Sequence, residues 1–284
     1  MFMNRKKGKK LKMVLKMSLV SLIFLLYMFP FIMIIINAFK SKRDIVKEPL
    51  ALIGENGVSF DNFINAFIKM NFLNALNNSI FITAISVFLI IILSSMTAYL
   101  FVRTNWFVCR IVFALLIFSM VIPFQVVMIP EVSIYGSILG VLNRRATLIF
   151  MHLGFSVSLA VFMYHGFIRT GIPISLEEAA EIDGATRLQT FFKVVFPLLK
   201  STTATIIILY ALGLWNDFLL PSLVLGKKSL FTLPLAARSF YGTYSSDLNL
   251  IMAALVMTVI PIIILYIALQ KYIVEGVVAG AVKS

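Results

Sequence analysis

Residues 79–102 read "SIFITAISVFLIIILSSMTAYLFV", an unbroken run in which no position carries a charge. The hydrocarbon core of a bilayer is about 30 Å thick, and a helix needs roughly 20 apolar residues to cross it. Five more stretches have a comparable length and composition, at about 14–38, 108–130, 146–168, 201–225 and 249–272. Because a water-soluble fold has no use for six such segments, the sequence predicts an all-α, polytopic membrane protein with six transmembrane helices.

The composition of the whole chain supports this class. Of the 284 residues, 61% are hydrophobic and only 13% are charged, which lies outside the range of soluble globular domains. Cys109 is the only cysteine, so neither an intrachain disulfide nor a Cys-based metal site is expected. Neither an internal repeat nor a low-complexity tract divides the chain, and we therefore expect a single transmembrane domain over residues 1–284.

The membrane topology follows from the positive charges. The N-terminal "MFMNRKKGKKLK" resembles the basic region of a signal peptide, but the apolar run after it is longer than a signal peptide needs. We therefore expect a retained first helix that follows a basic cytoplasmic N-terminus over about 1–13. In that orientation 15 of the 25 Lys and Arg residues lie on the cytoplasmic side. Both termini are then cytoplasmic, and a nucleic-acid partner is not expected because no soluble domain accompanies the basic stretch.

The cytoplasmic loop 169–200 concentrates acidic residues. Four of the chain's 12 acids lie within seven positions of this loop: Glu177, Glu178, Glu181 and Asp183. Ser175 precedes Glu178 by three residues, the spacing of a capping box, which predicts a short helix from about Leu176. Gly184 is a residue type that ends helices. A second amphipathic helix is expected over about 185–195.

Two roles are open for this helix pair. It can be a solvated cytoplasmic element, or it can dock on a partner. Glu177 and Glu181 form an unfavourable like-charge pair four residues apart. Ala180 and Gly184 form a stripe of small residues beside these acids. Small residues with an acidic rim suit insertion into a groove lined by basic residues, which favours docking.

The same stretch carries a longer motif. Glu178-Ala179-Ala180, Gly184 and the segment Val194–Pro197 match the spacing of the EAA loop of permease subunits in binding-protein-dependent ABC importers. Further stretches resemble the sugar-importer permeases of the maltose-system G type: "NAFK", "LWNDFLLP" (214–221), "TLPLAARSFYGTY" (232–244) and "IMAALVMTVIPIIILYIALQKYIVEGVVAGAVK" (251–283).

This resemblance implies a type I ABC importer permease (MetI-like) fold in a bacterial plasma membrane. It implies three partners: a second homologous permease, a dimeric cytoplasmic ATPase that binds ATP and Mg²⁺, and an extracytoplasmic sugar-binding protein or lipoprotein. The residues expected to couple the chain to the ATPase are Glu178, Ala179, Ala180, Asp183 and Gly184. The resemblance also places the C-terminal tail 274–284 toward the ATPase, although a disordered end is equally open.

Catalysis by the chain itself is not expected. The nearest approach to a phosphate loop is "LGKKS" (225–229), but Pro221 stands where the motif requires its first glycine. His152 and His165 are 13 positions apart in the predicted fourth helix. This spacing turns them away from one another, so packing near the helix ends is the expected role of both. We therefore predict no catalytic residue, no metal site and no cofactor bound by this chain.

The substrate path is less clearly marked. Trp215, Asn216 and Asp217 are expected in the middle of the fifth helix, where a carboxylate is costly and faces a bundle interior or water. They either line the path or hold neighbouring helices, and Gln125 beside Pro123 is a further candidate. An ATP-independent transporter or channel is the alternative class, although only Asp217 is deeply placed. Which sugar is carried, or whether the solute is instead a glycerol-phosphate compound, stays open.

Overall fold

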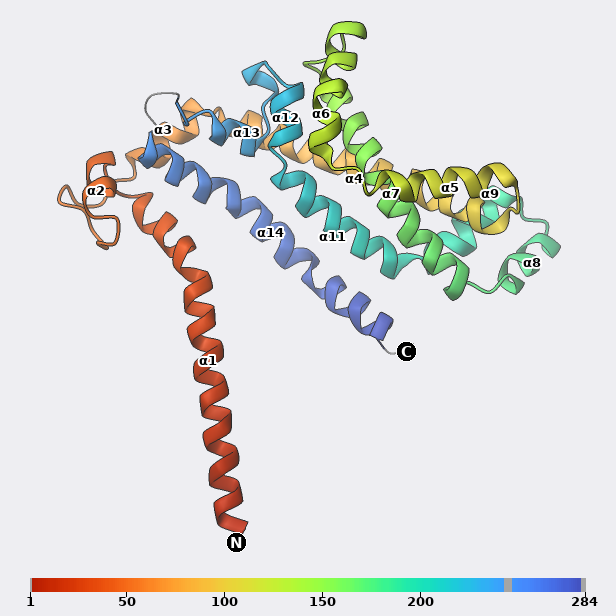
Figure 1. Ribbon diagram of the computed structural model, residues 1–284, viewed down its shortest axis with the longest axis horizontal. Helices are drawn as coiled ribbons and strands as arrows, with labels where there is room; N and C mark the ends of the chain where they lie inside the picture. The colour runs from red at the N-terminus through yellow and green to blue at the C-terminus, as the bar shows by residue number, and fades with distance from the viewer. Residues whose placement is uncertain (1, 243–246, 282–284) are drawn as a thin grey trace. The chain divides into compact units, whose positions relative to one another are not determined.

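The computed structural model describes residues 2–242 and 247–281, and the side chains of 12–242, 247–268 and 270. This part of the chain forms helices and loops, and an isolated β-bridge joins Gly54 and Gly57 (Figure 1). Four helical stretches are long and apolar enough to cross a membrane, namely Lys12–Asn37, Phe72–Arg103, Arg145–Gly171 and Leu248–Ala268. The all-α, polytopic prediction is therefore confirmed.

Two further candidate spans are bent. The pair Phe107–Ser119 and Phe124–Ile138 turns by 105°, and the pair Arg187–Leu198 and Lys200–Asn216 turns by 75°. Six spans result if each bent pair crosses the membrane once. The first bend falls at Pro123, which cannot donate a backbone hydrogen bond and disfavours helix in the residue before it.

Backbone contacts divide the chain into two compact units. The first comprises Met1–Met70 with Ala237–Val259, and the second Asn71–Ala236 with Ile260–Ser284. Elements wholly in the first unit are α1 (Phe2–Asn37), α2 (Lys42–Lys47) and α3 (Asp61–Lys69). Two helices contribute to both units, α13 (Leu233–Arg238) and α14 (Leu248–Ala281). The expected tail 274–284 is thus helical up to Ala281, and its last three residues lie outside the described part.

The first unit is held by buried polar groups. Asn62 donates from its side-chain amide to the carbonyl oxygens of Ala38 and Lys40, each at 2.9 Å, and accepts a hydrogen bond from Asn249 at 2.7 Å. Lys40 is only 1% exposed, and its ammonium donates to two backbone carbonyls. These bonds satisfy groups that would otherwise be costly to bury, and they fix the loop after α1.

Gly54 has no room for a side chain. A Cβ atom added there would collide with the carboxylate of Asp44, which is buried and accepts hydrogen bonds from Asn56. We expect Gly54→Ala to destabilise the unit by about 1–3 kcal/mol, the usual cost of overpacking. Thermal unfolding of the purified protein in detergent measures this cost. Ser59→Ala is a suitable control because it alters only exposed hydrogen bonds. Gly57→Ala is unsuitable because the φ of Gly57 is +78°, which strains any residue with a side chain.

The second unit contains most of the helices that could carry a site. They are α4 (Phe72–Arg103), α5 (Phe107–Ser119), α6 (Phe124–Ser133), η1 (Ile134–Ile138), α7 (Arg145–Gly171), α8 (Ser175–Ile182), α9 (Arg187–Thr190), η2 (Phe191–Val195), α10 (Phe196–Leu198), α11 (Lys200–Asn216), α12 (Leu219–Val224) and η3 (Lys228–Leu230).

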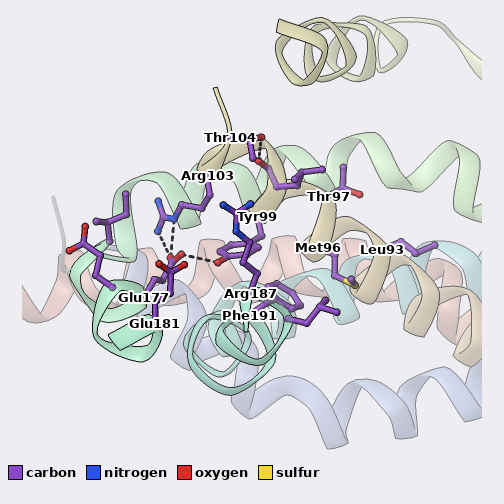
Figure 2. Close-up of a pocket in the computed structure, with 14 residues that line it drawn as sticks. Leu93, Met96, Thr97, Tyr99, Arg103, Thr104, Glu177, Glu181, Arg187 and Phe191 are labelled. Atoms are coloured by element: carbon purple, nitrogen blue, oxygen red, sulfur yellow. Dashed lines mark hydrogen bonds and ion pairs between the residues drawn. The ribbon is translucent and has the colours of Figure 1, made fainter. Parts of the chain in front are cut away.

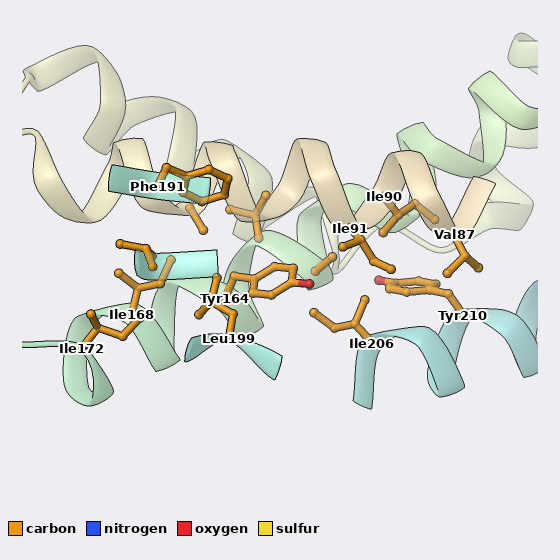
Figure 3. Packing of buried hydrophobic residues seen from close by; sticks show 14 of the residues in the cluster. Val87, Ile90, Ile91, Tyr164, Ile168, Ile172, Phe191, Leu199, Ile206 and Tyr210 are labelled. Atoms are coloured by element: carbon orange, nitrogen blue, oxygen red, sulfur yellow. The ribbon is translucent and has the colours of Figure 1, made fainter. Parts of the chain in front are cut away.

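The core of this unit lies between α4, α7 and α11. Ile90, Tyr164 and Ile206 meet there with no or almost no exposed surface (Figure 3). Hydrogen bonds join the same helices, because Tyr164 pairs with Thr203 at 2.9 Å and the Tyr210 hydroxyl donates to a carbonyl of α7. Phe191 and Val195 of η2 belong to this core. The core therefore anchors the second half of the acidic helix pair.

Candidate coupling site

Helix α8 is the short helix that the acidic stretch predicted, but its first turn is built differently. Ser175 lies inside the helix, Ile174 is the N-cap, and no side chain caps the helix. The expected capping box between Ser175 and Glu178 is therefore wrong. The carbonyl oxygen of Ile174 instead accepts the backbone N–H groups of Glu177 and Glu178, at 2.9 and 3.0 Å. A capping box does form 11 residues after Ser175, at Thr186, where α9 starts.

The turn after α8 follows the prediction. Asp183 is the C-cap and Gly184 adopts a φ of +82°, a left-handed conformation that glycine takes without penalty. Thr186 and Gln189 then form the reciprocal side-chain and backbone bonds that start α9. The second helix lies where it is expected, because the chain is helical from Arg187 to Leu198, but α9 gives way to a π-helical turn at Phe191. That turn directs Phe191 and Val195 into the core.

Glu177 points inward. It is 6% exposed and accepts hydrogen bonds from Arg103 at 2.7 and 2.9 Å and from the Tyr99 hydroxyl at 2.9 Å (Figure 2). Arg103 also donates to the carbonyl oxygen of Ile172, at 2.9 Å, and so joins the end of α4, the end of α7 and the start of α8. A cation at a helix C-terminus and an anion in a first turn both complement the helix dipoles.

This arrangement answers the puzzle of the like-charge pair. Glu177 is bound to Arg103, whereas Glu181 is exposed to solvent, so the repulsion between two carboxylates on the same side of α8 is offset by the arginine and by water. The role of Arg103 escaped sequence reasoning because nothing in the spacing relates residues 74 positions apart. The one available signal was an arginine at the end of a long apolar run.

The residues expected to meet the ATPase lie on α8 and the turn after it, and Glu178 also lines the cavity between α8 and α4. Glu178, Ala179, Asp183 and Gly184 are exposed, and Ala180 is half-buried. Ile182 lies between Glu181 and Asp183 on the same helix, and 87% of its surface is exposed. This value is high for an isoleucine that lies outside the candidate membrane spans. Its exposed apolar side chain is available for contact with a partner. We call Ile182 and the five residues expected to meet the ATPase the α8 outer face; sequence reasoning did not include Ile182.

A cavity of about 580 Å³ separates α4 from the α8–α9 turn (Figure 2). Apolar side chains of α4, among them Leu93 and Met96, line one wall, and Glu177, Glu181 and Arg187 line the other. The helix pair is therefore not packed tightly on α4 along this side. The bonds from Arg103 and Tyr99 to Glu177 bridge the two walls.

The residues expected along a substrate path are only partly brought together. The prediction that Asp217 lies in the middle of a helix is wrong, because α11 ends at Asn216. The Asp217 side chain instead accepts the backbone N–H of Leu219 at the start of α12. Trp215 is buried, and Asn216 is exposed and bonded to its own helix. Gln125 is an exposed residue in the first turn of α6, directly after the Pro123 bend.

His152 is the partner that sequence reasoning missed for Asp217. Its Nε2 atom lies 3.2 Å from a carboxylate oxygen of Asp217, and the imidazole is 3% exposed. The expectation that His152 packs at a helix end is wrong, because it joins α7 to the break between α11 and α12. His165 instead stacks on Phe113, with ring centroids 4.1 Å apart.

The described part of the chain combines apolar candidate membrane spans with a short, exposed acidic helix between two of them. Residues 90–278 match the family described as binding-protein-dependent transport system inner membrane component, and the chain belongs to that family.

Two curated relatives cover nearly the whole chain. "Probable starch degradation products transport system permease protein AmyC" of Thermoanaerobacterium thermosulfurigenes is 40% identical over 92% of this chain and 93% of its own length. The melibiose/raffinose/stachyose import permease protein MelC of Bacillus subtilis is 38% identical over 90% of this chain and 91% of its own length.

A solved structure shares the fold. A chain of a bacterial ABC transporter involved in import of the acidic polysaccharide alginate superposes with a TM-score of 0.75, covering 93% of this chain and 97% of its own. Its sequence identity of 23% makes this a likeness of fold alone.

Proposed function

We propose that this chain is a membrane-spanning permease subunit of an ATP-driven importer for oligosaccharides. The observation that carries the proposal is the α8 outer face, in which exposed acids surround the exposed Ile182. Arg103 fixes this helix through its bond to Glu177. Such a face suits a groove lined by basic and apolar side chains on another subunit. The family of the chain and the transport systems named for its relatives support the same function.

The proposed assembly contains three partners. A dimeric cytoplasmic ATPase receives the α8 outer face and supplies ATP and Mg²⁺, a second homologous permease completes the membrane path, and an extracytoplasmic binding protein delivers the sugar. ATP hydrolysis belongs to the ATPase and not to this chain. Closure of the ATPase dimer would move α8 as a rigid body, one of the known modes of switching between two states.

The proposed orientation places both termini and α8 in the cytoplasm. It rests on the excess of Lys and Arg in the segments on that side. The proposed sugar class is starch-derived or raffinose-type oligosaccharides, by analogy with the relatives. We further propose that Asp217 shapes the break after α11 through His152, and that Asn216 and Gln125 are the two exposed residues of the predicted set available to a solute.

Uptake into proteoliposomes tests the function. Vesicles containing the full complex, with the binding protein outside and Mg-ATP inside, should accumulate labelled maltotetraose or raffinose. Omitting the ATPase subunit should abolish accumulation. Uptake by this chain and its partner permease without the ATPase would contradict the proposal and indicate an ATP-independent transporter.

A further inference from the structure

Helix α4 carries buried polar attachments at its N-terminal end. Asn78 has no exposed surface and donates to the carbonyl oxygens of Ser229 and Phe231, at 3.0 and 2.9 Å. Ser79 accepts the backbone N–H of Leu233 at 2.8 Å, and Asn74 donates to Ser229 at 2.7 Å. The segment Ser229–Leu233 is thus bonded to the first two turns of α4 through its backbone.

The other end of α4 carries the attachment to α8. Arg103 and Tyr99 occupy the last turns, and both bond to Glu177 across the cavity behind α8. These bonds connect α4 directly to α8 across a cavity that limits packing between the two helices. Removing Arg103 would leave the buried Glu177 carboxylate with only a phenol as partner, which is strongly unfavourable.

Between these attachments α4 is a continuous helix. Its 32 residues include neither glycine nor proline, and its inner face is buried against α7 and α11. At 1.5 Å per residue the helix spans about 48 Å, enough to cross a bilayer completely. Proline and glycine, two common causes of a sharp kink, are absent, and the helix runs unbroken past Ser95, whose hydroxyl donates to the Ile92 carbonyl oxygen. A displacement of one end can therefore be carried to the other.

We propose that α4 is a rigid link between α8 and the segment Ser229–Leu233, with Arg103 and Asn78 as its attachment residues. A movement of α8 pulls Glu177, Arg103 passes the movement to α4, and Asn78 passes it to the segment on the opposite side of the membrane. This inference rests on the proposed function, since it takes the ATPase as the source of the movement. It assigns positioning roles to Arg103, Glu177 and Asn78, none of which contacts ATP.

Hydrogen–deuterium exchange of the complete complex tests the link. Peptides covering 175–184 report on α8, and peptides covering 229–233 report on the opposite segment, where the Leu233 N–H is bonded to Ser79. In the wild type, Mg-ATP with vanadate should change the exchange of both peptides. In Arg103→Gln the change at 175–184 should persist, whereas the change at 229–233 should shrink by about fivefold or more, the lower end of measured couplings between sites.

Further variants separate transmission from simple loss of structure. Asn78→Leu should have the same selective effect, and the double variant Arg103→Gln/Asn78→Leu should lose no more than either single one. The charge swap Arg103→Glu/Glu177→Arg should restore the response if Arg103→Gln fails to assemble. Tyr164→Phe removes a hydrogen bond inside the core without touching either attachment, so its response at both peptides should match the wild type.

The outcomes are distinct. A full response at 229–233 in Arg103→Gln, with the complex assembled, would overturn the link while leaving the proposed function intact. The link is also overturned if the wild type responds at 175–184 but not at 229–233. Absence of any response at 175–184 in the wild type would overturn the proposed function and the link together.

Discussion

Glu178→Lys should abolish ATPase docking on this chain while leaving membrane insertion intact. Glu178 is exposed in the first turn of α8, and the Arg103 bond that holds the helix goes to Glu177 instead. Reversing its charge places a cation where the proposed groove is basic, and like charges across an interface cost several kcal/mol. Each 1.4 kcal/mol is a factor of about ten in affinity. Co-purification of the ATPase with the tagged permeases should fall by roughly a hundredfold or more.

Two companion variants sharpen this prediction. Glu55→Lys reverses an acid in an exposed ion pair with Lys47 far along the sequence, and exposed pairs contribute little. It should co-purify the ATPase at the wild-type level. Gly184→Pro should resemble Glu178→Lys, because proline cannot adopt the φ of +82° and lacks the N–H that bonds to Glu181. Wild-type ATPase recovery with Glu178→Lys would refute docking through the α8 outer face.

Asp217→Leu should destabilise the protein by about 3 kcal/mol, through loss of a helix cap and of a buried partner. The carboxylate accepts the Leu219 N–H at 3.0 Å and lies 3.2 Å from the His152 imidazole, which is 3% exposed. Leucine satisfies neither group. Thermal unfolding in detergent should show a clear decrease in the midpoint.

Two further variants separate the contribution of the His152–Asp217 contact from that of the bond between Asp217 and the Leu219 N–H. Asp217→Asn keeps a good capping side chain and should cost less than Asp217→Leu. If His152 is the partner, the double variant His152→Leu/Asp217→Leu should cost less than the sum of the single ones. Strict additivity would mean that the two side chains do not interact in the protein.

Sequence reasoning captured the features that depend on local pattern. The apolar runs predicted the helical membrane class, because length and lack of charge suffice for that inference. Gly184 marked the end of α8, because its left-handed conformation is a local property. The acids of the α8 outer face were found because their clustering is visible within a few positions.

The misses required knowledge of the packing. Arg103 bonds to Glu177 and His152 to Asp217 across 74 and 65 positions, and no periodicity reveals such partners. The expected cap at Ser175 and the unbroken fifth helix were wrong because backbone geometry at Ile174 and Asp217 decided where the helices begin and end. Ile182 was overlooked because an apolar residue at a helix end normally indicates a buried contact.

The most direct measurement is a crosslink from Ile182. Cys109 is buried and can be replaced by alanine, after which Ile182→Cys provides a single reactive position on the α8 outer face. In the assembled complex, a short thiol crosslinker should join this cysteine to the ATPase, whereas Thr170→Cys, exposed at the end of α7, should react weakly. Efficient capture at Thr170 and none at Ile182 would contradict docking through α8.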